Sequence, residues 1–249
     1  MADCRQDRAL PSTGLVAFRV AGAALAFALL RRATTRVPIT HRGDYARLAL
    51  YSLLGVVLNQ FLFVKGLELS TVINATLLGT AIPVFTLLVS TLLGRERATL
   101  RAVSGTALAA CGVIYLIDPL RADFSDDTTL GNLLLVCNAA AYGAYIALSQ
   151  DMIRRYGALT VITWIFAFGC VAAVPAGAFH LAQTPLENVG IEIWVAVLYI
   201  ILVPTVGAYY LNAWALTRVA PSTVAIYVYL QPLIAYAVAP FVLGAGERW

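Results

Sequence analysis

Arg19 is the residue whose chemistry is least expected from its surroundings in this sequence. It stands in an apolar run that extends from near Ser12 to near Leu30, roughly 12 Å into a helix that rises about 1.5 Å per residue. A charged side chain at that depth in a membrane is costly and normally faces a bundle interior or a wet cavity. Two interpretations are open: contact with a substrate or with gating backbone carbonyls, or a purely structural arginine.

Amide and aromatic side chains form a second group of candidates. Amides in lipid would leave donors unpaired, so we expect them to face the bundle interior, where they bind substrate or only hold helices together. Aromatic rings with a polar group suit an amphipathic organic substrate. Together with Arg19, the predicted cavity residues are Asn59, Asn74, Asn138, Tyr142, Trp164, Asn212, Trp214, Tyr227, Tyr229 and Gln231.

Pro83 and Pro232 fall inside apolar runs at equivalent places in the two halves of the chain. A proline removes one backbone hydrogen bond and bends a helix. The pair therefore predicts two hinges for a rocking motion, with two static bends as the alternative.

Enzyme chemistry finds little support in the sequence. Its two histidines, His41 and His180, stand apart, and no HExxH, GxSxG or Walker motif occurs. The four cysteines lack the spacing of metal ligands or of a disulfide framework. We therefore expect no catalytic residue, no metal site and no cofactor.

The elements that must carry these residues are membrane helices. Of the 249 residues, 61% are hydrophobic and 12% charged, whereas a soluble domain is nearer half apolar and about a quarter charged. The apolar runs are continuous rather than alternating, which excludes barrel strands, and each is near the about 20 residues of a spanning helix. The sequence predicts an all-α polytopic bundle of about eight spans, near Ser12–Leu30, Leu48–Val64, Thr71–Leu93, Leu100–Ile117, Leu130–Ser149, Ala158–His180, Ile193–Leu216 and Pro221–Leu243.

Basic residues gather in alternate loops between these runs, at residues 31–47, 95–101, 154–155 and 218. The net charge of +4 therefore reflects membrane topology, and we expect no nucleic-acid partner. Because positive loops stay on the cytoplasmic side, these loops are predicted to be cytoplasmic. The expected location is the cell (inner) membrane, as a multi-pass protein.

Two stretches of the chain repeat one pattern. The pair Gly66-Leu67 begins 17 positions before Pro83, and Ala215-Leu216 begins 17 positions before Pro232. Both copies end in a Gly…Glu-Arg segment, at residues 94–97 and 244–248. The second copy lies five predicted helices further on, and an odd number inverts it in the membrane. Inverted repeats are typical of secondary transporters; the alternative is that prolines and glycines are simply common in membrane helices.

These residues resemble the EamA-type transporters of the drug/metabolite transporter superfamily. The likeness is carried by residues 66–75, 82–85, 94–97, 215–216, 221–225, 230–234 and 244–248. It implies two inverted five-helix repeats, here at residues 1–120 and 128–249, which work by alternating access. The implied substrate is a small organic metabolite such as an amino acid or a related compound, with export expected over uptake. The expected partners are that substrate and the lipid bilayer, with a homodimer left open.

The same resemblance predicts two absent helices. The segment from Pro11 to Arg19 resembles the start of the family's second helix, and residues 132–145 resemble the first helix of the second repeat. The family's first and tenth helices would then be absent, as in a truncated gene product, a misassigned start or a fragment. The alternative function is a truncated, non-transporting membrane protein or an assembly subunit.

Overall fold

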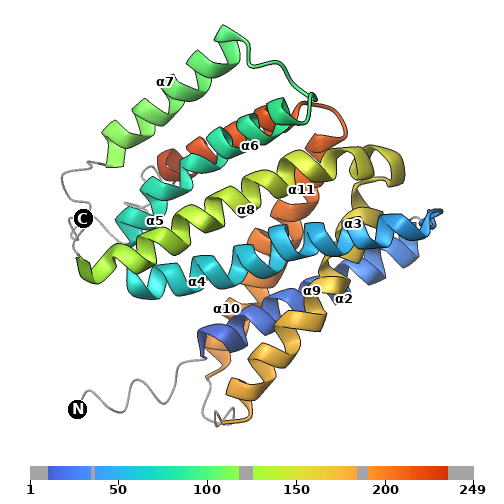
Figure 1. Cartoon of the computed structure of the whole chain (residues 1–249). Coiled ribbons are helices and arrows are strands. Elements are labelled where there is room, and N and C mark those ends of the chain that lie inside the picture. Colours follow the sequence, from blue (N-terminus) through green and yellow to red (C-terminus); the bar gives the residue numbers. More distant parts are fainter. Residues whose placement is uncertain (1–10, 35–36, 118–125, 184–189, 235–249) are drawn as a thin grey trace. The chain divides into compact units, whose positions relative to one another are not determined.

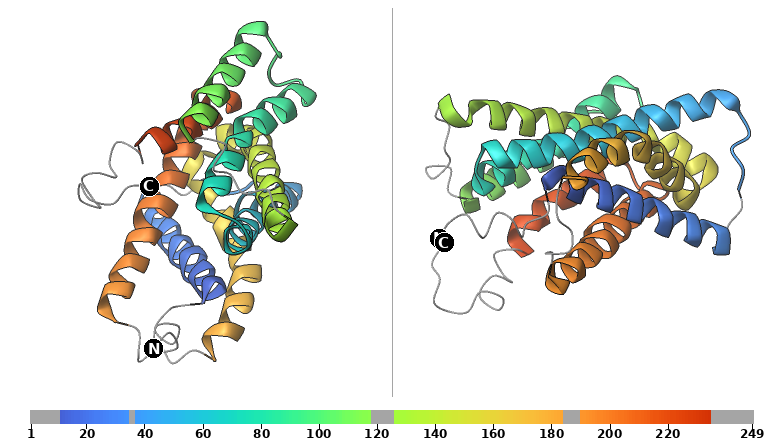
Figure 2. Two further views of the ribbon diagram at one scale, coloured as in Figure 1. Left: turned by 90° about the vertical axis from the view of Figure 1, so that its left-hand side faces the viewer. Right: turned by 90° about the horizontal axis from the view of Figure 1, so that it is seen from below.

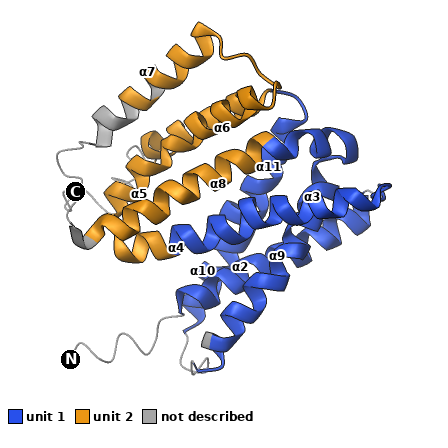
Figure 3. Cartoon of the chain, viewed as in Figure 1, with its two compact units in different colours: residues 1–64, 148–219 blue, residues 65–147, 220–249 orange. Residues whose placement is uncertain are grey.

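The computed structural model describes residues 11–34, 37–117, 126–183 and 190–234, and these form helices joined by short loops, without a strand. The predicted all-α class is therefore confirmed. The chain divides into two compact units. Unit 1 contains residues 1–64 and 148–219, and unit 2 contains residues 65–147 and 220–249 (Figure 3). Both units thus draw on both halves of the sequence, and the division into repeats at residues 1–120 and 128–249 stays a prediction.

Unit 1 carries α2, α3, α9, α10, α11 and two π-helices, η1 and η4 (Figure 1). Two helices, α4 and α8, begin in one unit and end in the other. The bounds are α2 Ser12–Thr34, α3 Arg42–Ser52, π-helix η1 Leu53–Leu58, α4 Asn59–Leu69, α8 Asp126–Tyr156, α9 Ala158–Leu181, α10 Ile191–Ile200, π-helix η4 Ile201–Gly207 and α11 Ala208–Leu216.

The core of unit 1 is the contact between α2 and α9, which lie side by side (Figure 1). A Cβ atom added at Gly177 would lie 2.2 Å from Cβ of Ala17, so glycine lets the two backbones approach closely. Further along the same contact, the rings of Phe27 and Phe166 are 5.2 Å apart, and both side chains are fully buried. Small residues at one end and aromatic rings at the other thus fix the crossing of these helices.

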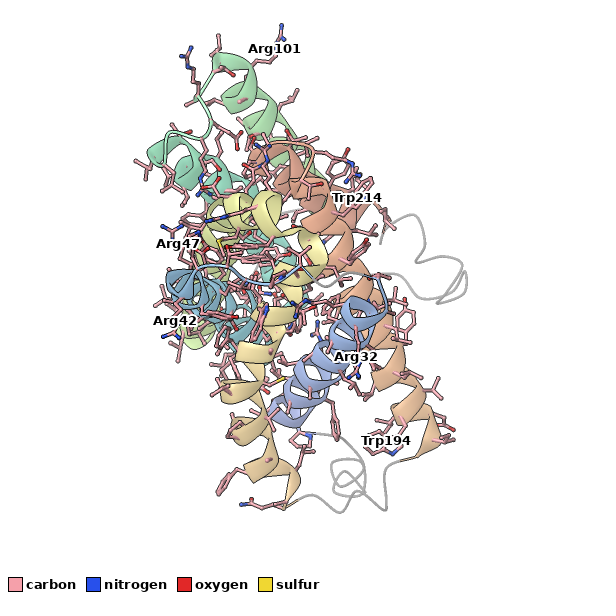
Figure 4. All side chains as sticks on the ribbon, turned by 90° about the vertical axis from the view of Figure 1, so that its right-hand side faces the viewer. Arg32, Arg42, Arg47, Arg101, Trp194 and Trp214 are labelled. Atoms are coloured by element: carbon pink, nitrogen blue, oxygen red, sulfur yellow. The ribbon has the colours of Figure 1, made fainter. Side chains whose placement is uncertain are left out.

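The elements α10, η4 and α11 form one continuous rod (Figure 2). Pro204 lies in η4, and because a proline has no N–H for the α-helical bond, the rod changes to a π-helix there. Trp194 and Trp214 lie at opposite ends of the rod (Figure 4). Trp194 packs edge-to-face on Phe18 of α2, with ring centroids 5.3 Å apart.

Unit 2 is built around α6, which packs against α12. Glu96, in the loop after α6, accepts hydrogen bonds from the backbone N of Ser222 at 3.1 Å and from its hydroxyl, so it caps the first turn of α12. A Cβ atom added at Gly143 of α8 would lie 2.9 Å from the Ile82 carbonyl oxygen. The remaining bounds are α5 Val72–Gly79, α6 Ala81–Leu92, α7 Leu100–Ile117, α12 Pro221–Ile226 and the 3-10 segment η5 Tyr227–Tyr229.

Both predicted hinge prolines follow an interruption in their helix. The α-helix breaks at Thr80, three residues before Pro83, where the Thr80 N–H donates to the Leu77 carbonyl at 3.1 Å. The 3-10 segment η5 ends three residues before Pro232. A proline cannot bond to the carbonyl four residues earlier, and its ring crowds that carbonyl. The breaks therefore have a common cause, while motion about them stays a prediction.

Within the described residues, six helical stretches are long and apolar enough to cross a membrane: Ser12–Thr34, Arg42–Leu69, Val72–Leu92, Thr128–Tyr156, Ala158–Phe179 and Ile191–Leu216. Each corresponds to one of the eight predicted spans. The predicted span at Leu100–Ile117 is helix α7, and the one at Pro221–Leu243 is described only to residue 234. The Gly…Glu-Arg ending of the second repeat, at residues 244–248, lies outside the described residues.

Candidate functional site

Arg19 lies within unit 1, and its guanidinium is held by a neutral oxygen. Nε donates to Oγ1 of Thr205 in η4 at 3.3 Å. Thr205 is fully buried, and its hydroxyl in turn donates to the Ile200 carbonyl at 2.8 Å. Among the carboxylates that the structure describes, none forms an ion pair with Arg19. The guanidinium of Arg19 therefore has no ion-pair partner among the described acids.

Tyr209, four residues after Thr205, extends this group of polar side chains. Its hydroxyl donates to the Gly55 carbonyl at 2.7 Å and accepts from Nδ2 of Asn59 at 2.9 Å. Gln60 also hydrogen bonds to this hydroxyl and is only 3% exposed. We call this group the arginine site; its members are Arg19, Asn59, Gln60, Thr205 and Tyr209.

Two π-helical segments supply backbone and side chains to the arginine site. The carbonyl of Gly55 belongs to η1, and Thr205 belongs to η4. A π-helical turn inserts an extra residue, which shifts side chains around the helix and loosens the regular hydrogen-bond ladder, and such turns are frequent at functional sites. Each of the two helices is thus altered in the stretch that contacts the buried polar side chains.

The other predicted residues of unit 1 lie elsewhere. Trp164 packs edge-to-face on Tyr45 at 5.0 Å between ring centroids, with the guanidinium of Arg31 5.9 Å from its ring. Trp214 is 44% exposed and stacks under the guanidinium of Arg218 at 3.8 Å. The structure therefore brings Asn59 together with Arg19, and leaves these two tryptophans outside the arginine site.

In unit 2, Asn74 is part of a buried hydrogen-bond network. It is fully buried, and Nδ2 donates to Oδ1 of Asn132 at 2.9 Å and to Oγ of Ser70 at 3.2 Å. The Ser70 hydroxyl donates to the same Asn132 oxygen at 2.6 Å. The network ties the start of α5 to α8, which accords with the structural interpretation of Asn74.

The remaining unit 2 candidates differ in exposure. Tyr142 stacks against Tyr145 at 5.6 Å between ring centroids. Tyr227 is 62% exposed and Gln231 is also exposed, whereas Tyr229 is 4% exposed. Tyr227, Tyr229 and Gln231, which all precede Pro232 closely in the sequence, therefore do not share one environment.

Four predicted residues carry a buried polar atom with no hydrogen-bond partner in the described part of the chain. Buried polar atoms are normally bonded to protein or water. These atoms are consequently polar groups that the described part of the fold does not use. They are Nε1 of Trp164 and Oδ1 of Asn212 in unit 1, and Oδ1 of Asn138 and the hydroxyl of Tyr229 in unit 2.

Sequence reasoning did not indicate Thr205 as a member of this site. Thr205 is one polar residue in an apolar run, and helical periodicity gives no reason to single it out. The signal that could have located it is Pro204 beside it, because a proline within a span marks the place where backbone bonding changes.

The arginine site offers donors rather than catalytic groups. The guanidinium of Arg19 and the amide of Asn59 can donate to an oxygen-rich ligand, while the hydroxyls of Thr205 and Tyr209 already donate to backbone carbonyls and hold the site together. Arginine binds carboxylates well through its fork of N–H groups. No cluster of metal-binding side chains occurs among the described residues. The arrangement is suited to binding a polar or anionic group.

Several known proteins resemble this chain. A transporter of Archaeoglobus fulgidus, named as uncharacterized, is 28% identical over 191 residues, which cover 76% of this chain and 65% of that protein. The transporter YetK of Bacillus subtilis is 24% identical over 83% of this chain and 63% of its own length. A WAT1-related protein of Arabidopsis thaliana is 26% identical over 96% of this chain and 67% of its own length. The chain thus spans about two thirds of the length of these relatives.

A solved crystal structure of another protein superposes with a TM-score of 0.77 at 19% identity, over 96% of this chain and 83% of that chain, which shows a shared fold. The model of the EamA-like transporter family matches residues 6–117 and again residues 129–247. The multi-pass helical architecture agrees with that match. The chain belongs to the EamA-like transporter family, within the drug/metabolite transporter superfamily.

Proposed function

We propose that this protein moves a small organic metabolite, such as an amino acid or a related compound, across the cell (inner) membrane by alternating access, with export as its direction. The basic loops at residues 31–47, 95–101, 154–155 and 218 then face the cytoplasm. No catalytic step, metal or cofactor takes part in this proposal.

The observation that carries the proposal is the state of Arg19. Its guanidinium sits inside a candidate span, bonded to the Thr205 hydroxyl, with no described acid paired to it. A charge in such a place is costly to a membrane protein and is typically retained for a substrate or ion path. Asn59 beside it adds an amide whose second N–H can bind a substrate's polar end, and the Tyr209 hydroxyl positions that amide.

The helix interruptions support the alternating-access part of the proposal. Thr80 before Pro83 and η5 before Pro232 are places where the backbone already lacks α-helical bonds. Bending there would cost less than bending an intact helix. The two prolines are equivalent positions of the sequence repeat, as a symmetric rocking motion requires.

Counterflow in proteoliposomes tests the proposal. Proteoliposomes that contain the purified protein are loaded with each of a panel of unlabelled amino acids and related carboxylates, and uptake of the same labelled compound from outside is followed. We expect counterflow of at least one compound, and a loss of roughly tenfold or more for Arg19→Gln, with partial retention in Arg19→Lys because the charge remains. Arg32→Gln is the matched control, since Arg32 is exposed at the end of the same helix.

Equal counterflow rates for Arg19→Gln and Arg32→Gln, at equal amounts of folded protein, would show that Arg19 does not contact the substrate. Absence of counterflow for every compound, with a folded wild-type protein, would contradict transport by this chain. Fluorescence-detected size exclusion reports the folded fraction in each case.

A further inference from the structure

A second polar site lies in unit 1, away from Arg19. It is a cavity of about 490 Å³ lined by the end of α2, the junction of α8 and α9, and the end of α11. Its apolar lining includes Leu159, Tyr210 and Trp214, and its basic lining consists of Arg155 and Arg218. The cavity thus combines an aromatic wall with two guanidinium groups.

The beginning of α9, a helix of 24 residues, forms part of the cavity lining. Gly157, with φ of 82°, turns the chain between α8 and α9, and the first bond of α9 runs from Val161 N to the Gly157 carbonyl at 3.2 Å. The amides of the three residues between them therefore have no acceptor within the helix. Free amides and the positive end of the helix dipole favour an anion at such a place.

Thr160 gives an independent indication of a ligand. It is 1% exposed and lines the cavity, and its Oγ1 is buried without a hydrogen-bond partner among the described residues. By contrast, the hydroxyl of Thr163, one turn later, donates to the Leu159 carbonyl at 2.6 Å. A buried hydroxyl left open in the first turn of a helix is a donor that the fold itself does not use.

The charges at this cavity are not balanced. Arg155 is paired with Asp44 at 3.3 Å, and Asp44 is also near Arg47 at 3.8 Å and accepts from the Tyr156 hydroxyl at 2.7 Å. Arg218 has no carboxylate partner in the described part of the chain. Its guanidinium lies over the Trp214 ring, with its central carbon 3.8 Å from the ring centroid, and donates to the Thr217 hydroxyl at 2.9 Å. Among the described residues, Arg218 is thus a cation at the cavity that no carboxylate pairs with.

We propose that this cavity binds an amphipathic anion: a phosphate or carboxylate at the α9 amides, Thr160 and Arg218, joined to an apolar or aromatic body packed against Tyr210 and Trp214. A free metabolite and the headgroup of an anionic lipid share this chemistry. Binding here does not depend on transport, so it can be measured on protein that transports nothing.

The test is isothermal titration of the purified protein in phosphatidylcholine nanodiscs with phenyl phosphate, inorganic phosphate and phenol. Phenyl phosphate carries both the anion and the ring, so it should bind saturably, and the other two should bind at least about tenfold more weakly. Arg218→Gln should weaken binding of phenyl phosphate by about tenfold, because a charge-assisted hydrogen bond is lost. Arg32→Gln serves as the control, since Arg32 does not line the cavity.

Thr160→Val separates ligand binding from folding. Valine keeps the shape and removes a buried hydroxyl that lacks a partner, so the melting temperature should not fall. Binding of phenyl phosphate should nevertheless weaken by about threefold. A variant that folds as well as wild type and binds as well as wild type would overturn the role of Thr160.

Adding phosphatidylglycerol to the nanodiscs identifies the source of the ligand. If the natural occupant is a lipid headgroup, phosphatidylglycerol abolishes phenyl phosphate binding, and Arg218→Gln weakens that competition. If it is a free metabolite, phenyl phosphate binds equally in both membranes. Both results support the site. It is overturned if phenyl phosphate does not bind in phosphatidylcholine alone, or binds Arg218→Gln as tightly as Arg32→Gln.

Discussion

The hydroxyl of Tyr209 is the group whose removal most directly tests the arginine site. The change Tyr209→Phe deletes one donated bond, to the Gly55 carbonyl, and the bonds accepted from Asn59 and Gln60. Tyr209 is 6% exposed and Gln60 is 3% exposed, so water cannot readily replace the lost partner.

The magnitude follows from the groups left behind. Interhelical hydrogen bonds in membrane proteins average about 0.6 kcal/mol, whereas a buried group left without a partner costs about 1–3 kcal/mol. Because the partners of Tyr209 are buried, the second figure applies, and we expect the free energy of unfolding to fall by about 2 kcal/mol. The adjacent Tyr210→Phe is the matched control: Tyr210 is 38% exposed, and the change should stay within about 0.5 kcal/mol.

The assay is reversible unfolding in mixed micelles, with SDS as denaturant and tryptophan fluorescence as signal. A double-mutant cycle with Asn59→Ala should show a coupling energy of about 0.6 kcal/mol or more between residues 59 and 209. If Tyr209→Phe unfolds at the same SDS fraction as Tyr210→Phe, the hydroxyl does not hold η1 to α11, and the account of the arginine site is refuted.

Two further predictions concern unit 2. A Cβ atom at Gly131 would lie 2.7 Å from the carbonyl carbon of Leu69, a backbone atom that no side-chain rotation can move. Gly131→Ala should therefore lower the free energy of unfolding by about 1–3 kcal/mol in the same SDS assay. The control is Gly105→Ala, which has nothing within 4 Å of the added atom and should be neutral or stabilise by up to about 1 kcal/mol. Equal effects of the two changes would refute the close approach at Gly131. Glu96→Ala removes the acceptor for Ser222 and should lower the free energy of unfolding by about 1 kcal/mol. Hydrogen exchange at the first turn of α12 should accelerate. Unchanged protection of these amides would contradict the capping role of Glu96.

Composition and periodicity sufficed for the fold class because lipid imposes a strong rule: every spanning backbone must satisfy its own hydrogen bonds. They could not give the partners of a buried residue. Arg19 was predicted as a buried cation, yet its acceptor Thr205 is 186 positions away. Asn59 was predicted to face inward, and its partner Tyr209 is 150 positions away. Such pairings depend on which helices cross, which a single sequence does not encode locally.

The fine structure of the helices was also beyond the sequence pattern. A proline predicts lost bonding, and both Pro83 and Pro232 follow a real interruption. The π-helix η1 contains no proline; its residues 53–58 read as an ordinary apolar run around Gly55. The Gly55 carbonyl in this segment accepts a hydrogen bond from Tyr209 of another helix, a tertiary contact that the local pattern does not give.

The arginine site is held together in a way that preserves its charge. A buried arginine can be stabilised by an acid, which neutralises it, or by neutral acceptors, which do not. In this site Arg19 bonds to the Thr205 hydroxyl, and the neighbouring Tyr209 uses its own hydroxyl on Gly55 and Asn59. Thr205 is itself fixed by its bond to the Ile200 carbonyl, five residues earlier in the chain. The π-helical turn therefore positions a neutral acceptor for Arg19 and leaves the guanidinium with its positive charge and its remaining N–H donors, the two properties that binding of an anionic group requires.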